Sequence, residues 1–274
     1  MHVLLFAPGP GTAARVPVLA CADALGRGAT TAVVPLETDA EVDAALARAA
    51  AEDARVVVAG GDGPLRAVLR RMVRQVVPRG GDRAGLRDDR TIPDLPPVGI
   101  LPLEPTDPGD LAGRLSLPRR PGEVAAAVLG GSIRRLDLLR NDGGSVTLHG
   151  AMIGAAGEDG RPLGWRARID VDDKELSDGS EPLVACAVAN GGGYADLAGL
   201  PLVLSADPAD GLLDVGIALP DGHGFEVRRA RGRAVSVSVV SSEVPFTDDT
   251  VDGTLTRKRT WWMEAGAWAV YAPE

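Results

Sequence analysis

Glycines surround an aspartate at the point where a run of β-branched residues gives way to a run of helix-forming residues. The segment reads Gly60, Gly61, Asp62, Gly63 and Pro64. This order predicts a buried strand, a tight turn and the start of a helix. The first turn of a helix has backbone N–H groups without partners, and glycines let a phosphate approach them. Asp62 beside such an anion site would suit a metal ion or an attacking hydroxyl group between them.

The same segment has a simpler interpretation. It could be an ordinary turn between a strand and a helix, in which Asp62 only caps the helix. Pro64 fits the first helical position, where its missing N–H costs nothing. Local sequence does not decide between these two hypotheses.

The elements that must position this segment alternate between strand and helix in the first part of the chain. Thr38 and Glu41 form a capping-box pattern before one of the helices. The alternation is typical of a parallel sheet covered by helices, as in a Rossmann-like domain. The expected strands are 2–7, 30–36, 55–59 and 98–103, and the expected helices are 13–25, 40–51, 65–77 and 123–129.

The pattern changes near Ser132, where short strand-like runs separated by Gly, Asp and Asn replace the helices. Such runs predict an antiparallel β domain, a sandwich or an open barrel. We therefore expect an α/β domain at residues 1–125 followed by a β-sandwich domain at 126–258. The tail, 259–274, is expected to return to the first domain. A cleft between the domains is the default place for a ligand.

Composition narrows the classes of function. The chain has 274 residues, a hydrophobic content of 45%, only 3% aromatic residues and a net charge of −9. This charge and the few aromatics argue against a nucleic-acid partner and allow at most transient contact with a membrane. Cys21 and Cys186 lie in apolar runs, so we expect buried thiols and a cytoplasmic protein. Neither a signal peptide nor a membrane span is expected. A homodimer is compatible with the sequence.

Further segments, taken in order, resemble motifs of the diacylglycerol kinase family and related lipid kinases. The glycine loop looks like the family's GGDGT nucleotide loop, although GGDG alone also occurs in NAD kinases. The later segments favour the lipid-kinase branch, and the resemblance covers nearly the whole chain. The matching segments are 60–63, 98–103, 110–118, 189–193, 210–215 and 251–253.

The resemblance implies ATP-dependent, Mg²⁺-dependent phosphoryl transfer to a hydroxyl group of a lipid or another hydrophobic molecule. It implies that Asp252 is the general base, that Asp62 acts at the nucleotide and metal, and that Asp210 holds Mg²⁺. Three carboxylates from three segments could meet at one cleft, because phosphoryl transfer needs charge neutralisation and in-line positioning. The residues implied in nucleotide binding are Gly60, Gly61, Asp62, Gly63, Thr106 and Asp110.

Several departures from the family pattern fall on the phosphate-facing loops. Pro64 replaces a threonine, residues 104–109 replace a Gly-Thr-Gly-Asn loop, Ala209 replaces an aspartate and Thr254 replaces a glutamate. Carboxylates in these loops would repel a triphosphate unless a metal intervened. A second hypothesis is therefore a repurposed member that uses no ATP and no cofactor. It would bind a hydrophobic small molecule, or transform it with the remaining carboxylates as acid and base.

A third hypothesis comes from a different class of protein. Residues 9–14 satisfy the pattern G-x-G-x-x-A, and Glu37 ends the next strand at a suitable distance for a ribose contact. These features would suit an NAD(P)-binding oxidoreductase. Pro10 argues against it, because a proline removes an N–H where a pyrophosphate needs one. His149 alternates with apolar neighbours in a strand and is interpreted as a core or cleft histidine.

Overall fold

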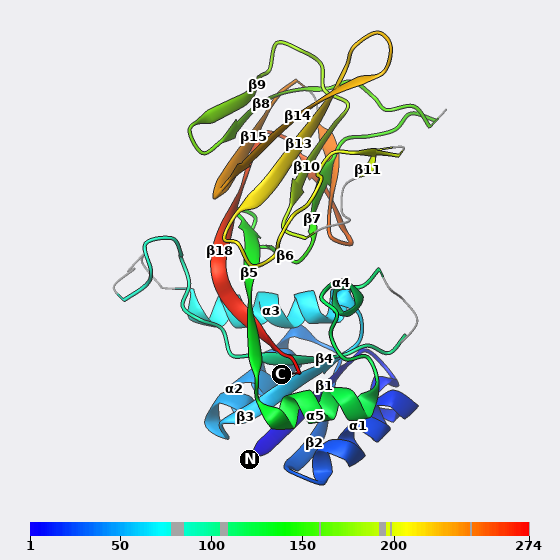
Figure 1. Cartoon of the computed structure of the whole chain (residues 1–274), viewed down its shortest axis with the longest axis vertical. Coiled ribbons are helices and arrows are strands. Elements are labelled where there is room, and N and C mark those ends of the chain that lie inside the picture. Colours follow the sequence, from blue (N-terminus) through cyan, green and yellow to red (C-terminus); the bar gives the residue numbers. More distant parts are fainter. Residues whose placement is uncertain are drawn as a thin grey trace. The chain divides into compact units, whose positions relative to one another are not determined.

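The computed structural model describes residues 1–77, 85–104, 109–158, 160–191, 196–197, 199–241 and 243–273. The chain divides into two compact units, one made of Met1–Leu136 and Ala267–Glu274 and the other of Asp137–Gly266. Two strands, β5 (Ile133–Asn141) and β18 (Lys258–Tyr271), contribute residues to both units (Figure 1). The expected class, a parallel α/β domain followed by an antiparallel β domain, is confirmed.

The first unit is built on a parallel sheet whose strand order is β2-β1-β3-β4-β18. The paired residues Phe6 and Val58 join β1 to β3, and Val270 of β18 pairs in parallel with Val98 of β4. β-Branched and leucine residues dominate these strands, which suits strands buried on both faces. The bounds are β1 His2–Pro8, β2 Thr30–Leu36, β3 Ala54–Ala59 and β4 Val98–Leu101.

Helices cover both faces of this sheet. α1 and α5 lie side by side and share an apolar core with Leu5 and Val57. Val56 points to the opposite face, because side chains alternate along a strand, and there it meets residues of α2 and α3. The predicted capping box of α2 is confirmed, since Thr38 and Glu41 exchange both hydrogen bonds. The helices are η1 Thr12–Ala14, α1 Val16–Gly26, α2 Asp39–Ala51, α3 Asp62–Val76, α4 Leu111–Arg114 and α5 Pro121–Gly130.

The start of α3 corrects one prediction. The helix begins at Asp62, so Pro64 occupies its third position and not its first. The proline still lies in the first turn, where its missing N–H removes no hydrogen bond within the helix. Asp62 and Gly63 extend the helix toward the sheet, which brings its first backbone N–H groups to the end of β3.

The second unit is a sandwich of two antiparallel sheets. One contains β15, β8, β9 and the first part of β18, and the other has the order β14-β13-β10-β7-β16-β17. Residues from both sheets share one core, among them Ile169, Cys186 and Trp261. The remaining strands are β6 Val146–Thr147, β7 Gly150–Ile153, β8 Arg166–Val171, β9 Lys174–Asp178, β10 Ala185–Ala189, β11 Asp196–Leu197, β12 Leu200–Pro201, β13 Leu213–Pro220, β14 Phe225–Gly232, β15 Ala234–Ser241, β16 Val244–Asp248 and β17 Val251–Leu255.

Two predictions about burial are also confirmed. Cys21 and Cys186 are buried, free thiols, and burial raises the pKa of each to about 12. At such a pKa the thiolate that would act as nucleophile or metal ligand is scarce at neutral pH. His149 is buried in the second unit. No helix in the described part of the chain has the length and apolar character needed to cross a membrane.

Candidate nucleotide-phosphate site

The carboxyl ends of three neighbouring strands define the candidate site. β1 lies between β2 and β3 in the sheet. The chain passes from β1 to its neighbour β2 on one side and then to β3 on the other side, so the order of the strands reverses at β1. Ligands of open α/β sheets bind at the carboxyl edge beside such a reversal of strand order. The loops after β1, β3 and β4 all reach this edge. The glycine loop, residues 60–63, follows β3 directly.

Gly60 is closed to ligands and has a structural role. Its φ of +136° belongs to a region that side chains rarely adopt, and a Cβ there would lie 2.9 Å from Cγ of Pro64. Its backbone N–H donates a hydrogen bond of 3.0 Å to the carbonyl of Leu101 at the end of β4. Gly60 therefore fixes the turn and joins two neighbouring strand ends.

Gly61 and Gly63, in contrast, are open. A Cβ added at either residue would meet nothing within 4 Å. Within the described ranges, no acceptor takes a hydrogen bond from either backbone N–H. Both groups lie at the N-terminus of α3, a helix of 15 residues, where the helix dipole favours negative charge. This arrangement fits a phosphate group.

Asp62 caps a helix other than its own. Its Oδ1 accepts a hydrogen bond of 3.0 Å from the backbone N–H of Leu111, the first residue of α4. The simpler hypothesis of a capping role is therefore supported for α4, a helix other than the one that contains Asp62. The contact joins the glycine loop to the segment that follows β4.

Asp110 lies at the same helix end and carries a compensated charge. It is the N-cap residue of α4, and its Oδ1 accepts from the backbone N–H of Gly113 at 2.8 Å. Arg119 donates to both carboxylate oxygens of Asp110, at 2.5 and 2.8 Å, and also to the carbonyl of Glu104 at 3.0 Å. Asp62 and Asp110 are thus brought together around one short helix. Thr106, also predicted to bind nucleotide, lies outside the described residues.

Asp210, the predicted metal ligand, belongs to the second unit. Its Oδ1 accepts from the backbone N–H of Leu212 at 2.9 Å, and its Oδ2 accepts from Arg231. Arg231 also forms an ion pair with Asp214, at 3.0 Å, and the two carboxylates raise the pKa of Arg231. In the described ranges, no group of three His, Cys, Asp or Glu side chains is arranged to hold a metal. The present geometry therefore does not fit Mg²⁺ at Asp210 unless Arg231 moves.

A buried carboxylate that sequence reasoning missed holds the turn that carries Asp210. Asp137 is only 2% exposed and accepts hydrogen bonds of 2.6 Å from the backbone N–H groups of Gly211 and Gly266. Its own N–H donates to the carbonyl of Pro208 at 2.7 Å. Burial raises the pKa of Asp137, against the opposing effect of these two hydrogen bonds. No local pattern reveals this role, because the partners are 74 and 129 residues away.

Asp252, the predicted base, is exposed on β17. Its Oδ1 accepts a hydrogen bond of 2.8 Å from the hydroxyl of Thr247, its cross-strand partner on β16. The neighbouring Gly253 lies over the ring of Phe246, where a Cβ would come within 2.6 Å of the ring. The glycine therefore has a packing role, and the aspartate beside it remains accessible to a substrate.

Other buried polar residues join the strands of the second unit near His149. Asp249 accepts from the backbone N–H groups of Leu148 and His149 at 2.8 and 2.9 Å. Asn190 donates to the carbonyls of Asp137 and Leu148, each at 3.1 Å. These contacts give Asn190, which lies in one of the matching motifs, a structural role.

Comparison with known proteins identifies the fold of the whole chain and the family of its first part. Residues 8–141 match the family model described as the diacylglycerol kinase catalytic domain. A solved structure described as a diacylglycerol kinase from Bacillus anthracis has a TM-score of 0.70 and 15% identity, over 99% of this chain and 96% of that chain. A second structure from the same organism has a TM-score of 0.72 and 14% identity, over 99% and 97%. No curated protein matches this sequence. The family predicted from the motifs is thereby confirmed for residues 8–141, and the fold for the whole chain.

Proposed function

We propose, from the premise that residues 8–141 of this chain belong to the diacylglycerol kinase catalytic-domain family, that the protein is a lipid-kinase-like phosphotransferase. It transfers a phosphoryl group from ATP to a hydroxyl group of a lipid or another hydrophobic molecule. The observation that carries the proposal is the open N-terminus of α3. There Gly61 and Gly63 offer backbone N–H groups at the carboxyl edge of a parallel sheet.

In this proposal the first unit holds the nucleotide. The N–H groups of Gly61 and Gly63 and the positive end of the α3 dipole bind the phosphates. The ion pair of Arg119 with Asp110 removes a negative charge that would otherwise repel them. Asp62 keeps the phosphate-binding turn and the start of α4 in register through its hydrogen bond to Leu111.

The acceptor hydroxyl is proposed to meet Asp252. This carboxylate is exposed, and its contact with Thr247 fixes its orientation on the strand. It would take the proton of the acceptor hydroxyl as the oxygen attacks the terminal phosphorus of ATP. The bond between that phosphorus and the bridging oxygen breaks, and ADP leaves.

The fit to Mg²⁺ is weaker than the fit to phosphate. Mg²⁺ in phosphotransferases is usually held by one or two carboxylates together with the substrate phosphates. Asp210 is engaged with Arg231, so its carboxylate can hold Mg²⁺ only if that ion pair opens.

Calorimetric titration with ATP, with and without Mg²⁺, tests the nucleotide site. Binding in the millimolar range or tighter is expected, and the absence of both binding heat and a thermal shift at millimolar ATP would overturn the proposal.

Asp252→Asn should abolish phosphorylation of diacylglycerol in mixed micelles and leave ATP affinity unchanged. Asp173→Asn, at another exposed aspartate of the second unit, is the matched control and should leave turnover unchanged. Full turnover of Asp252→Asn would reject the assignment of the base.

A second candidate is a member of the family that no longer uses ATP and binds a hydrophobic small molecule. One ion pair favours it, because Arg231 neutralises Asp210, the carboxylate predicted to hold the metal. Mass spectrometry of protein purified without denaturation would reveal a bound hydrophobic molecule. An empty protein that phosphorylates lipids would reject this candidate.

A further inference from the structure

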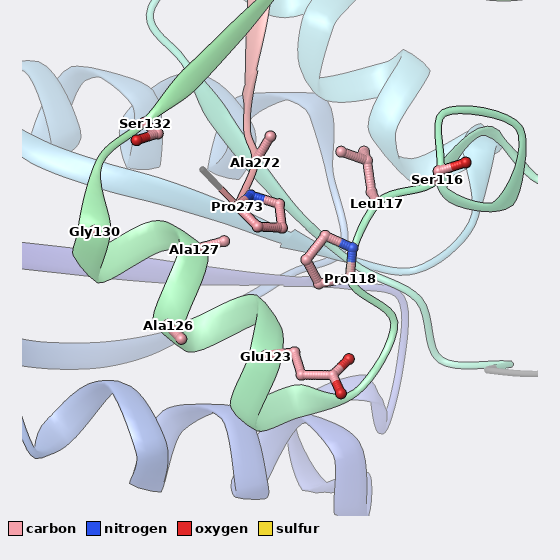
Figure 2. A pocket seen from close by; sticks show the side chains of 10 residues that line it. All are labelled: Ser116, Leu117, Pro118, Glu123, Ala126, Ala127, Gly130, Ser132, Ala272 and Pro273. Carbon is pink, nitrogen blue, oxygen red and sulfur yellow. The ribbon is translucent and has the colours of Figure 1, made fainter.

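A pocket in the first unit shares no lining residue with the glycine loop, Asp110, Asp210 or Asp252. Its volume is about 570 Å³, within the range of small-molecule sites. Three segments line it: the chain after α4, the exposed side of α5 and the residues that follow β18. Figure 2 shows Leu117, Pro118, Ala127 and Pro273 around the same space, with Glu123 at one end.

The wall is mainly apolar, and Glu123 is the single charged residue among the described residues that line it. Leu117 and Ala127 are buried, and two prolines complete the apolar surface. Glu123 is 55% exposed, and its Oε1 lies 3.7 Å from Arg120, which is itself 83% exposed. An ion pair this exposed is weak, so the carboxylate can accept hydrogen bonds from a ligand.

The residues of α5 that line the pocket come from both halves of the helix. Ala126, Ala127 and Gly130 lie in its second half, and Glu123 lies in its first turn. Arg55 donates to the carbonyls of Val128 and Leu129, and Arg134 donates to the carbonyl of Leu115. The guanidinium groups of Arg55 and Arg134 are thus engaged with backbone carbonyls, and neither residue lines the pocket. The described wall therefore combines an apolar surface with one carboxylate, that of Glu123.

We infer that this pocket binds a small aliphatic molecule whose head group is an ammonium or another hydrogen-bond donor. The apolar wall of Leu117, Pro118 and Pro273 takes the chain, and Glu123 accepts from the head group. The inference does not depend on the proposed phosphotransfer, since the pocket shares no residue with the glycine loop, Asp210 or Asp252.

Octylammonium and octanoate, which share one alkyl chain, test the inference by amide NMR of the full-length, isotope-labelled protein. Octylammonium should bind saturably and shift the amides of Ala126, Ala127, Gly130 and Ser132. It should bind about three-fold or more tightly than octanoate, because the carboxylate of octanoate would be repelled by that of Glu123. Glu123→Gln should remove most of this preference. Equal affinity for the two compounds, or shifts elsewhere only, would overturn the inference.

Two glycines of α5 provide a matched pair of variants. A Cβ at Gly130 or at Gly122 would meet nothing within 4 Å, but only Gly130 lines the pocket. Gly130→Trp should abolish octylammonium binding, and Gly122→Trp should preserve it, with both proteins folded by thermal melting. Unchanged binding to Gly130→Trp would refute the site. If Gly130→Trp does not fold, Ala126→Trp, at an exposed helical position, serves as the blocking variant with the same two outcomes.

Discussion

The carboxylate of Asp62 lies 3.0 Å from the backbone nitrogen of Leu111, so a residue at the start of α3 holds the start of α4. Asp110 caps the same short helix from its own side. The glycine turn after β3 and the segment after β4 are therefore joined by the carboxylate of Asp62. A substitution in either segment should therefore alter the structure or stability of the other.

Removal of the Asp62 carboxylate should cost stability as well as activity. Asp62→Ala should lower the free energy of unfolding by about 1 kcal/mol, the usual cost of losing a helix cap. Asp62→Asn keeps an acceptor oxygen and should lose less than half of that. Urea unfolding measures both, with Asp23→Ala, at an exposed aspartate of α1, as the control. An Asp62→Ala protein as stable as wild type would contradict the capping role.

The pair of Asp110 with Arg119 should be energetically coupled. Both side chains are mostly buried, at 12% and 19% exposure, and two parallel hydrogen bonds join them. A double-mutant cycle with alanine should give a coupling of about 1–2 kcal/mol. Arg119→Lys should recover little of it, because an ammonium cannot form both bonds. The exposed pair of Arg120 with Glu123 is the comparison and should show almost no coupling.

Two neighbouring glycines should respond differently to alanine. Gly60→Ala forces a Cβ against Pro64 at an unfavourable φ and should cost about 1–3 kcal/mol of stability. Gly61→Ala places its Cβ in open space and should change stability by less than about 0.5 kcal/mol. The same methyl group would stand where a phosphate approaches, so Gly61→Ala should weaken ATP binding in calorimetry. Unchanged ATP affinity in a folded Gly61→Ala protein would exclude this loop as the phosphate site.

Asp137 should give the protein a specific pH dependence. Burial raises the pKa of this carboxyl above its ordinary value of 3.8. Between 3.8 and the raised pKa, the folded protein binds more protons at this residue than the unfolded chain does. The contribution of Asp137 to the free energy of unfolding must therefore fall as pH rises through that window.

Comparison with Asp137→Asn isolates this effect. The variant lacks the titration, so the stability of wild type minus that of Asp137→Asn should decrease as pH rises through the window. Urea unfolding at a series of pH values measures the difference, and titrations common to both proteins cancel. A difference that grows with pH would show that the two backbone hydrogen bonds outweigh the effect of burial.

The sequence predicts those features that depend on neighbours along the chain. Apolar strands, the capping box at Thr38 and the glycine turn are local patterns, and the structure contains them. The start of α3 differs from its prediction because Pro64 tolerates any position in the first turn. The pattern at residues 9–14 forms a 3-10 turn, and α1 begins only at Val16, whereas the dinucleotide fingerprint opens a helix directly.

The partners of the candidate site could not be predicted in the same way. Arg119 is 9 residues from Asp110 and Arg231 is 21 residues from Asp210, across turns whose path the sequence does not encode locally. The sequence contains several arginines near these positions, but an arginine on a loop can either be solvated or form an ion pair with a carboxylate. Which arginine pairs with which carboxylate depends on the folded structure. This pairing in turn determines whether an aspartate is available to bind a metal.

The path of β18 has a consequence for how this protein is made. Its last residues, from Ala267 on, belong to the first unit, where Val270 pairs with Val98 of β4. The residues of the β sandwich lie between β4 and the end of β18 in the sequence. During synthesis, β4 is therefore an edge strand with one unpaired side until the whole sandwich has left the ribosome. Most of the first unit is thus synthesised before the second unit, but its sheet can be completed only after the second unit has been synthesised.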